Sequence, residues 1–173
     1  VIALVGVKDI IRADAKDIIS ELSKDKEVIM LTGDNKVTAG VIAKELNISN
    51  VISNVLPSEK IKEIKNLMKD KTVMMVGDGI NDAPSLATSN IGVSIGSGTD
   101  IANDSSDVIL MNDNLVNIIN LINISKKTIK IIKENLFWAF FYNICMIPIA
   151  IGLFSSFGIN MNPMIAGLSM TLS

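Results

Sequence analysis

The chain has 173 residues, enough for one domain of ordinary size, and its mean hydropathy of +0.44 with 49% hydrophobic residues is high for a wholly soluble protein. A net charge of -2 and scattered Lys residues offer no basic surface, so we do not expect nucleic acid as a partner. The absence of His excludes imidazole as a base or metal ligand, and the single Cys excludes an internal disulfide. Any chemistry must therefore use carboxylates, amides, hydroxyls and Lys.

Short apolar runs alternate with amphipathic segments up to about residue 120, a pattern typical of the strands and helices of a parallel α/β sheet. The first run, "VIALVGV", has no charged leader and does not begin with Met, so we expect a piece of a longer polypeptide. Further strands are expected in "EVIMLTGDN", "VISNVLP", "TVMMVGDG", "IGVSI" and "DVILM". Helices are expected over Ala13–Leu22, Lys36–Leu46, Ser58–Met68 and Leu115–Glu134, with Val37, Val41 and Ile42 buried by the second.

Polar loops follow the carboxyl ends of these strands, where an open α/β sheet binds its ligands. The residues are Thr32, Gly33 and Asp34 after one strand, Gly77, Asp78, Asn81 and Asp82 after another, and Lys60 in the helix between them. Two carboxylates would repel a phosphoryl group unless a hard cation such as Mg²⁺ lay between, so the pattern indicates phosphate chemistry with a metal ion. The alternative is that both loops are simple turns, with Asp34 and Asp78 capping the helices that follow.

Three segments, "MLTGDN", "LPSEK" and "VGDGINDAP", resemble the later phosphorylation-domain motifs of P-type cation-transporting ATPases, members of the haloacid-dehalogenase-like superfamily. "IGVSIGSGTDIANDSSDVILM" extends the similarity. The resemblance implies a Rossmann-like parallel sheet of the haloacid-dehalogenase type, with ATP as substrate. It also implies the site residues: Asp78, and more weakly Asp82, for Mg²⁺; Lys60 to neutralise a phosphoaspartate; Thr32 with Gly33 and Asp34 for the phosphoryl group; Asn81 and Asp82 in support; and Asp9, Thr32 and Asp34 for cofactor binding.

The nucleophile of that family is the Asp of an Asp-Lys-Thr-Gly motif, and this tetrapeptide does not occur in the sequence. Asp9 follows a strand, but "KDIIRAD" resembles the hinge where the phosphorylation domain resumes after the nucleotide-binding domain. We therefore predict that the chain alone does not form an acyl phosphate.

Charged residues stop at Glu134, and the remainder to Ser173 is longer than the roughly 20 residues of a membrane span. The expected organisation is a phosphorylation domain over 1–120, a connecting helix over 121–134, a transmembrane helix over 135–157, and a turn with the start of another transmembrane helix over 158–173. Aromatic residues near the start of the span are typical of an interfacial belt. Lys126, Lys127, Lys130 and Lys133 place that start on the cytoplasmic side, so we expect a multi-pass protein of a bacterial plasma membrane with a cytoplasmic phosphorylation domain.

Polar atoms in the expected spans indicate which ion is moved. The spans contain no carboxylate, whereas thioether and neutral oxygen suit Cu⁺ better than hard cations. The "YN" pair with a Pro five residues after the Asn, and "MTLS", resemble the copper-transporting branch of the heavy-metal P-type ATPases. This resemblance implies that Tyr142, Asn143, Met170 and Ser173 bind the transported ion. The alternatives are a belt aromatic at Tyr142, apolar filling at Met170 and helix packing at Ser173, while an unpaired amide at Asn143 would be costly in lipid.

The function that the resemblance implies is ATP-driven Cu⁺ transport through an aspartyl-phosphate intermediate. Its partners would be ATP, the metal ion, membrane lipid and the rest of the same polypeptide, namely actuator and nucleotide-binding domains and earlier spans. The alternatives are a soluble haloacid-dehalogenase-like phosphatase, a nonenzymatic membrane fragment, and a pump for Zn, Cd or Ag.

Overall fold

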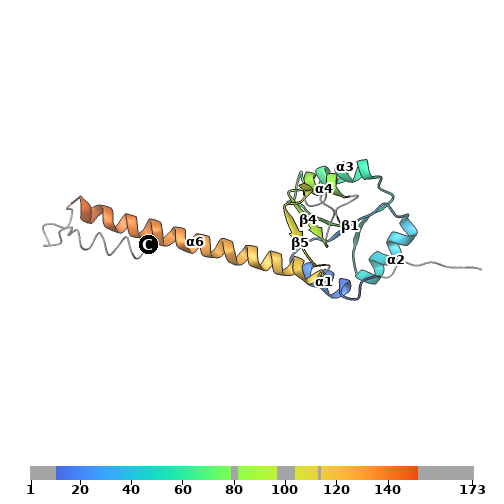
Figure 1. Ribbon diagram of the computed structural model, residues 1–173, viewed down its shortest axis with the longest axis horizontal. Helices are drawn as coiled ribbons and strands as arrows, with labels where there is room; N and C mark the ends of the chain where they lie inside the picture. Colours follow the sequence, from blue (N-terminus) through green and yellow to red (C-terminus); the bar gives the residue numbers. More distant parts are fainter. Residues whose placement is uncertain (1–10, 79–81, 97–103, 113, 152–173) are drawn as a thin grey trace, which may run out of the picture. The chain divides into compact units, whose positions relative to one another are not determined.

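The computed structural model describes residues 11–78, 82–96, 104–112 and 114–151, and divides the chain into two compact units, Val1–Asn120 and Leu121–Ser173 (Figure 1). The helices are α1 (Ala15–Leu22), α2 (Lys36–Leu46), α3 (Pro57–Leu67), α4 (Ala83–Thr88) and α6 (Val116–Ala150). The strands are β1 (Ile29–Leu31), β2 (Asn50–Ile52), β3 (Met74–Gly77), β4 (Ile91–Ile95) and β5 (Val108–Leu110). Strands and helices alternate in the first unit, as the sequence predicts.

Every strand pair in the described residues is parallel, but the strands form two sheets and not one. β1 pairs with β2, with Ile29 opposite Asn50, and a second sheet has the order β3-β4-β5, with Met74 opposite Ile91. Parallel neighbours require crossover connections, and helices supply several of them. The expected α/β fold with parallel pairing is confirmed, while no ladder joins β1 to β3 within the described residues.

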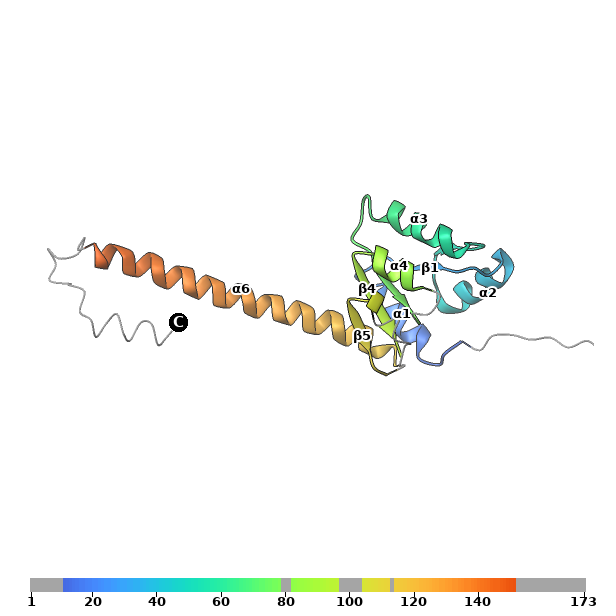
Figure 2. The same ribbon diagram turned by 45° about the horizontal axis from the view of Figure 1, so that its top comes forward.

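Apolar faces of the helices form the core of the first unit. Ile64 of α3, Leu86 of α4 and Val93 of β4 are almost completely buried. α3 packs against α4, and α4 in turn covers β3 and β4 (Figure 2). A Cβ added at Gly92 of β4 would lie 2.7 Å from the carbonyl oxygen of Leu86, so the close contact between α4 and the sheet requires glycine there.

The buried face of α2 differs from the predicted one. Val37 and Val41 are 78% and 52% exposed, and Ile42 is only half-buried, whereas Ala39, Ala43 and Leu46 are buried. The buried residues recur at intervals of four and three, which is one face of a helix. Small side chains on that face let α2 approach α1 closely, and the prediction of a valine face is wrong.

The helix α6 is continuous through the expected boundary at residue 134, and Pro148 lies inside it. Among the residues described, no helix combines the length and the apolar character that crossing a membrane requires. The expected strand over 1–7 and the second expected span lie outside the described residues, as do the last residues of the first span.

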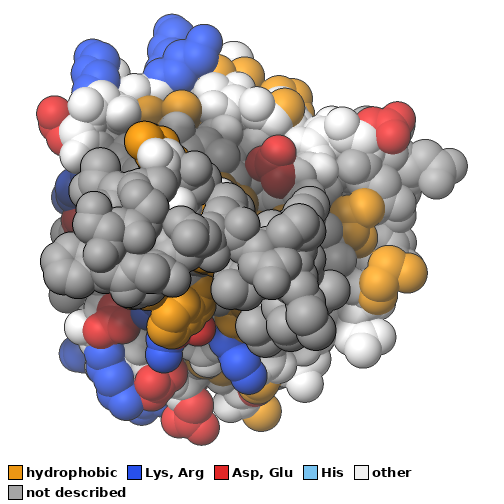
Figure 3. Space-filling view, turned by 90° about the vertical axis from the view of Figure 1, so that its left-hand side faces the viewer, with side chains coloured by type: hydrophobic (Ala, Val, Ile, Leu, Met, Phe, Trp, Pro, Cys, Tyr) orange, Lys and Arg blue, Asp and Glu red, His pale blue; other side chains and the backbone are white. Residues whose placement is uncertain are grey.

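Charged side chains of both signs are spread over the face shown in Figure 3. Lys and Arg side chains lie among Asp and Glu side chains there and do not gather into one broad basic field. The mixture is consistent with the small net charge of the sequence.

Candidate functional site

The Thr-Gly-Asp loop at the end of β1 is a hydrogen-bonded turn. The Thr32 hydroxyl donates to Asp34 Oδ2 at 2.7 Å and accepts from the Asp34 backbone N–H at 3.1 Å. Backbone bonds tie the turn to the loop after β2, because Val55 N–H donates to the Thr32 carbonyl and Asn54 N–H to the Asp34 carbonyl. Asn54 adopts a left-handed φ of 60°, which Asn tolerates better than most residues. The backbone around Thr32, Gly33 and Asp34 is therefore fixed by local turn chemistry.

The cap of α2 is Asn35 and not Asp34. The Asn35 side-chain oxygen accepts hydrogen bonds from the N–H groups of Val37 and Thr38, both at 3.0 Å. An Asn immediately before a helix is one of the strongest N-cap signals, and it could have been recognised in "GDNK". The alternative in which Asp34 serves as the helix cap is therefore wrong, and its carboxylate remains beside the Thr32 hydroxyl.

Lys60 and Asp82 form the most enclosed ion pair among the described residues. Lys60 Nζ lies 2.7 Å from Asp82 Oδ1, and the two side chains are only 16% and 17% exposed. Lys60 comes from the first turns of α3, and Asp82 is the N-cap residue of α4. The Asp82 carboxylate makes no capping hydrogen bond within α4 and instead forms the ion pair with Lys60. The structure thus joins two residues that the sequence predicts for one site.

Gly77 allows Asp82 to lie against the end of β3. A Cβ at Gly77 would be 2.9 Å from Asp82 Oδ2 and 3.0 Å from its Cβ, closer than real side chains approach. Asp78 follows directly, is exposed, and has no hydrogen bond or ion pair with any described residue. Lys60, Gly77 and Asp82 therefore cluster at the carboxyl end of β3, with Asp78 next to them in the chain.

The carboxylates needed for a metal site are not all present in the described part of the chain. No group of three or more Cys, Asp or Glu side chains there is arranged to hold a metal ion. Asp82 Oδ1 already contacts Lys60, whereas Asp78 makes no hydrogen bond or ion pair with any described residue. Asn81 and Asp9 lie outside the described residues. These residues alone do not complete the predicted Mg²⁺ site.

A cavity of about 310 Å³ lies along the facing edges of β1 and β3. Ile29 and Leu31 of β1, Met74 and Met75 of β3, and Ile64 and Leu67 of α3 contribute its apolar lining. At its rim, Lys71 donates a hydrogen bond to Glu27, and Asn50 Nδ2 donates to Glu27 Oε1 at 2.6 Å. The Lys71 hydrogen bond is the main reason that the pKa of Glu27 is lowered, and desolvation opposes it. The cavity separates the two sheets.

On α6, Tyr142 is half-buried and Asn143 is exposed. Asn143 Nδ2 donates to the Ala139 carbonyl oxygen at 2.7 Å, one helical turn earlier. The helix backbone therefore satisfies the N–H₂ group of Asn143, and its predicted role in binding the transported ion stays a prediction. Met170 and Ser173, predicted for the same ion site, lie outside the described residues.

The helix α4 and the Lys60–Asp82 pair were not predicted. Ala83 and Pro84, the last two residues of "VGDGINDAP", begin the helix, and Pro in a first turn is a helix-start signal that was available. The pair joins residues 22 positions apart, and spacing alone does not predict such a contact.

Comparison with known proteins shows the family to which this chain belongs. The family model of haloacid dehalogenase-like hydrolases matches residues 1–90, which is more than half of the chain. The chain therefore belongs to this haloacid dehalogenase-like family. Its parallel α/β fold and the carboxylate at the end of β3 are consistent with this membership.

Within that class, the similarity to P-type ATPases extends over the whole chain. A probable copper-exporting P-type ATPase of Archaeoglobus fulgidus is 43% identical over 98% of the chain and 21% of its own length. A probable copper-importing P-type ATPase A of Enterococcus hirae is 46% identical over 100% of the chain and 24% of its own length. The predicted resemblance to heavy-metal P-type ATPases is confirmed, and the chain spans about a quarter or less of these curated relatives.

A solved structure agrees with these sequence relatives. The crystal structure of a zinc-transporting PIB-type ATPase in the E2.Pi state matches with a TM-score of 0.82 and 33% identity, over 95% of this chain and 26% of that chain. The fold of this chain is therefore found in a zinc-transporting PIB-type ATPase as well as being expected in the copper-transporting sequence relatives.

Proposed function

We propose that this chain is part of an ATP-driven heavy-metal transporter that forms an aspartyl phosphate. The observation that carries the proposal is the enclosed Lys60–Asp82 pair beside Gly77, at the carboxyl end of β3. A cation held in place by a carboxylate, at the edge of a parallel sheet, suits a phosphoryl group that carries negative charge before and during transfer. Lys60 would neutralise the phosphoaspartate, and Asp82 would hold the Lys60 ammonium in position.

The turn after β1 would bind the phosphoryl oxygens. The Thr32 hydroxyl and the Gly33 N–H are the donors, and the backbone bonds to Asn54 and Val55 keep the turn rigid. Asp34 accepts from the Thr32 hydroxyl in the structure, so it would orient that group when no phosphate is bound. Asn81 and Asp9 remain proposed members of the site.

Mg²⁺ is proposed at the same edge of the sheet. Asp78 would supply one oxygen, and the remaining ligands would come from outside the described residues, because those described do not complete a set. When bound, the ion would neutralise charge on the phosphoryl oxygens. The chain's own contribution is an exposed carboxylate placed directly after the half-buried strand β3.

The cavity between β1 and β3 indicates where the nucleophilic Asp could enter the site. Both strands have an unpaired edge within the described residues, and unpaired strand edges are templates for another strand. We propose that a strand from elsewhere in the complete polypeptide inserts there and carries the nucleophilic Asp at its carboxyl end. Backbone amides at the two edges should then exchange with solvent faster in the 173-residue chain than in the complete polypeptide. Equal protection in both would contradict the insertion.

The reaction itself is tested by phosphorylation from ATP. The complete polypeptide should form a hydroxylamine-labile phosphoenzyme, as acyl phosphates do, and Lys60→Met should lower its steady-state level at least tenfold. Lys62→Met, an exposed lysine on the same helix, is the matched control and should leave the level unchanged. A phosphoenzyme that resists hydroxylamine would contradict an aspartyl phosphate.

The membrane part of the proposal depends on side chains of α6. After Glu134 the helix is uncharged, and its large apolar residues are exposed on several faces, including Phe137 at 59%, Trp138 at 64% and Phe140 at 60%. A helix that is apolar on all sides is stable only when lipid or other helices cover it. We propose that residues 135–157 cross a membrane and that residues 158–173 turn and begin another span.

Cu⁺ is the transported ion that we propose. The spans lack carboxylates, and the curated relatives are copper-transporting, although the solved zinc transporter has a similar fold. Tyr142, Asn143, Met170 and Ser173 would contribute ligands, with Asn143 using its carboxamide oxygen because its N–H₂ group is bound to Ala139. Pro148 has no N–H to bond the Ile144 carbonyl, which leaves a further oxygen near Asn143.

Metal selectivity is tested by ATP hydrolysis of the complete polypeptide in lipid with Cu⁺ under reducing conditions and, in parallel, Zn²⁺. Cu⁺ should stimulate the wild type, and Asn143→Ala should remove the stimulation. Asn135→Ala, a substitution at the beginning of the same uncharged segment, is the matched control. Stimulation by Zn²⁺ alone would overturn the copper assignment and retain the pump.

A further inference from the structure

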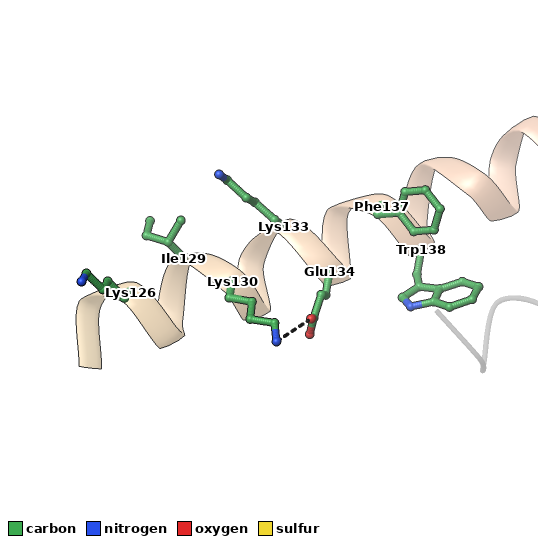
Figure 4. Close-up of a pocket in the computed structure, with 7 residues that line it drawn as sticks. All are labelled: Lys126, Ile129, Lys130, Lys133, Glu134, Phe137 and Trp138. Carbon is green, nitrogen blue, oxygen red and sulfur yellow. Dashed lines mark ion pairs between the residues drawn. The ribbon is translucent and has the colours of Figure 1, made fainter. Parts of the chain in front are cut away.

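Lysine and aromatic side chains of α6 line an open hollow of about 490 Å³ (Figure 4). Its lining residues are Lys126, Ile129, Lys130, Lys133, Glu134, Phe137 and Trp138. Lys126, Lys130, Lys133 and Phe137 follow one another at intervals of four and three residues, which places them on one face of the helix. From Lys126 to Phe137 this face is about 16 Å long, at about 1.5 Å per residue.

The aromatic end of the hollow is a compact cluster. The rings of Phe137 and Phe141 are stacked with centroids 5.9 Å apart, and Trp138 meets both rings edge-on at 5.6 and 5.9 Å. Phe137 and Trp138 are nevertheless 59% and 64% exposed. The cluster is thus preformed, and more than half of each of these two rings remains uncovered by the described protein.

The lysine end carries a net positive charge. Glu134 is the only acidic residue from Leu121 to Ser173, and all four lysines of that unit precede it within two turns. Lys130 turns toward Glu134 in Figure 4, with 3.7 Å between Nζ and Oε1, but the two side chains are 76% and 58% exposed. Such exposed pairs are weak and open readily. Lys133 forms no ion pair with any described residue.

We propose that this face of α6 binds anionic phospholipid headgroups, so that the protein prefers a negatively charged membrane surface. The inference rests on the proposed insertion of α6 into a membrane and adds the class of lipid. Lys130 and Lys133 would contact headgroup phosphates, while Phe137, Trp138 and Phe141 lie at the boundary with the acyl chains. Both a lipid headgroup and a free phosphate complement the charge of the lysines. Lipid is favoured because a free phosphate would leave the adjoining aromatic rings in water.

The experiment uses the 173-residue chain and its single tryptophan, Trp138. Vesicles of phosphatidylcholine alone are compared with vesicles in which one third of the lipid is phosphatidylglycerol. Binding is measured by flotation, which excludes aggregates, and by the blue shift of Trp138 emission and its quenching by brominated acyl chains. The chain should bind the anionic vesicles more tightly, and the difference should shrink in high salt.

The test variant is Lys130→Gln with Lys133→Gln, and the matched control is Lys62→Gln with Lys65→Gln on α3, which makes the same change in net charge at exposed positions. The test variant should bind anionic vesicles roughly 10- to 30-fold more weakly, since each lysine near such a surface contributes about a fivefold factor. Binding to phosphatidylcholine should not change, and helical circular dichroism checks the fold of both variants.

Three results would overturn the proposal, and they differ in what else they affect. Equal binding of the wild type to both vesicle types, with Trp138 quenched in each, would remove the anionic preference and leave membrane insertion intact. No flotation with either vesicle type would remove both. An equal loss in the control variant would show a net-charge effect and contradict a site on α6.

Discussion

The two units of this chain place their functional residues in opposite ways. In the first unit, charged groups are enclosed: Lys60 and Asp82 pair with little exposure, and backbone bonds fix the turn around Thr32. In the second unit, large apolar side chains such as Ile144 and Trp138 are exposed on a single helix. Packing within the first unit therefore holds the Lys60–Asp82 pair in place, whereas much of the apolar surface of α6 is left uncovered by the described residues.

The largest expected effect comes from one substitution made in each unit. Ile64→Ala should destabilise the first unit by about 2–5 kcal/mol, because Ile64 is 1% exposed and truncation leaves a cavity. Ile144→Ala removes the same atoms from a side chain that is 67% exposed and should change the stability of that unit by about 0.5 kcal/mol or less. Native-state hydrogen exchange of the β4 amides measures the first effect, and exchange of the α6 amides around Ile144 measures the second. Similar costs would mean that α6 is packed by the protein itself, and the comparison would fail.

The ion pair is the next largest contributor. Lys60→Met should destabilise the first unit by about 2 kcal/mol, because it leaves the Asp82 carboxylate enclosed without its cation. Asp82→Asn in the same background should recover part of this loss, since no charge then remains to be paired. Denaturant unfolding of the two variants and the double variant measures the coupling. Additive losses would show that the two side chains do not interact in solution.

Two glycines offer a smaller, paired test of the site. Gly77→Ala forces the Asp82 carboxylate away from a Cβ only 2.9 Å distant and should cost about 1–3 kcal/mol. Gly40→Ala on α2 meets no atom within 4 Å and should stabilise the chain by up to about 1 kcal/mol, because alanine favours helix. Opposite signs in thermal unfolding are the expected result, and a neutral Gly77→Ala would separate Asp82 from the end of β3.

The smallest expected effect is the pH dependence at Glu27. Because the Lys71 hydrogen bond lowers the pKa of Glu27 in the folded chain below its ordinary value, this group stabilises the fold above the unfolded pKa. The contribution should be lost as the pH falls through the lower, folded pKa. Stability measured against pH should therefore fall less steeply in Glu27→Gln than in the wild type below about pH 4.5. Parallel curves would contradict the role of the Lys71 contact.

Sequence patterns predicted the bounds of helices and strands best where residues within the element itself determine those bounds. The bounds of α2 and β4, Lys36–Leu46 and Ile91–Ile95, are confirmed, because capping and apolar runs set them. The buried face of α2 was wrong, because small residues pack closely and apolar spacing alone favoured Val37 and Val41. The division into two sheets depends on what lies between β1 and β3, which no local pattern reports.

For the site, the loop positions were predictable and the contacts were not. Open α/β sheets bind their ligands at the carboxyl ends of the strands, which predicted that Lys60 and Asp82 lie in one region. Their ion pair depends in addition on the packing of α3 against α4. The roles of Asp9, Asn81, Met170 and Ser173 stay predictions, since these residues lie outside the described part of the chain.

We propose that the enclosed Lys60–Asp82 pair and the exposed helix α6 belong to two coupled parts of one pump. The most direct measurement is the phosphoenzyme level of the complete polypeptide in lipid vesicles, formed from ATP with and without Cu⁺, for Asn143→Ala and Lys60→Met. The account predicts that Asn143→Ala loses only the Cu⁺-dependent increase, whereas Lys60→Met loses phosphorylation under both conditions. A Cu⁺-dependent increase in Asn143→Ala equal to that of the wild type would contradict the coupling through α6.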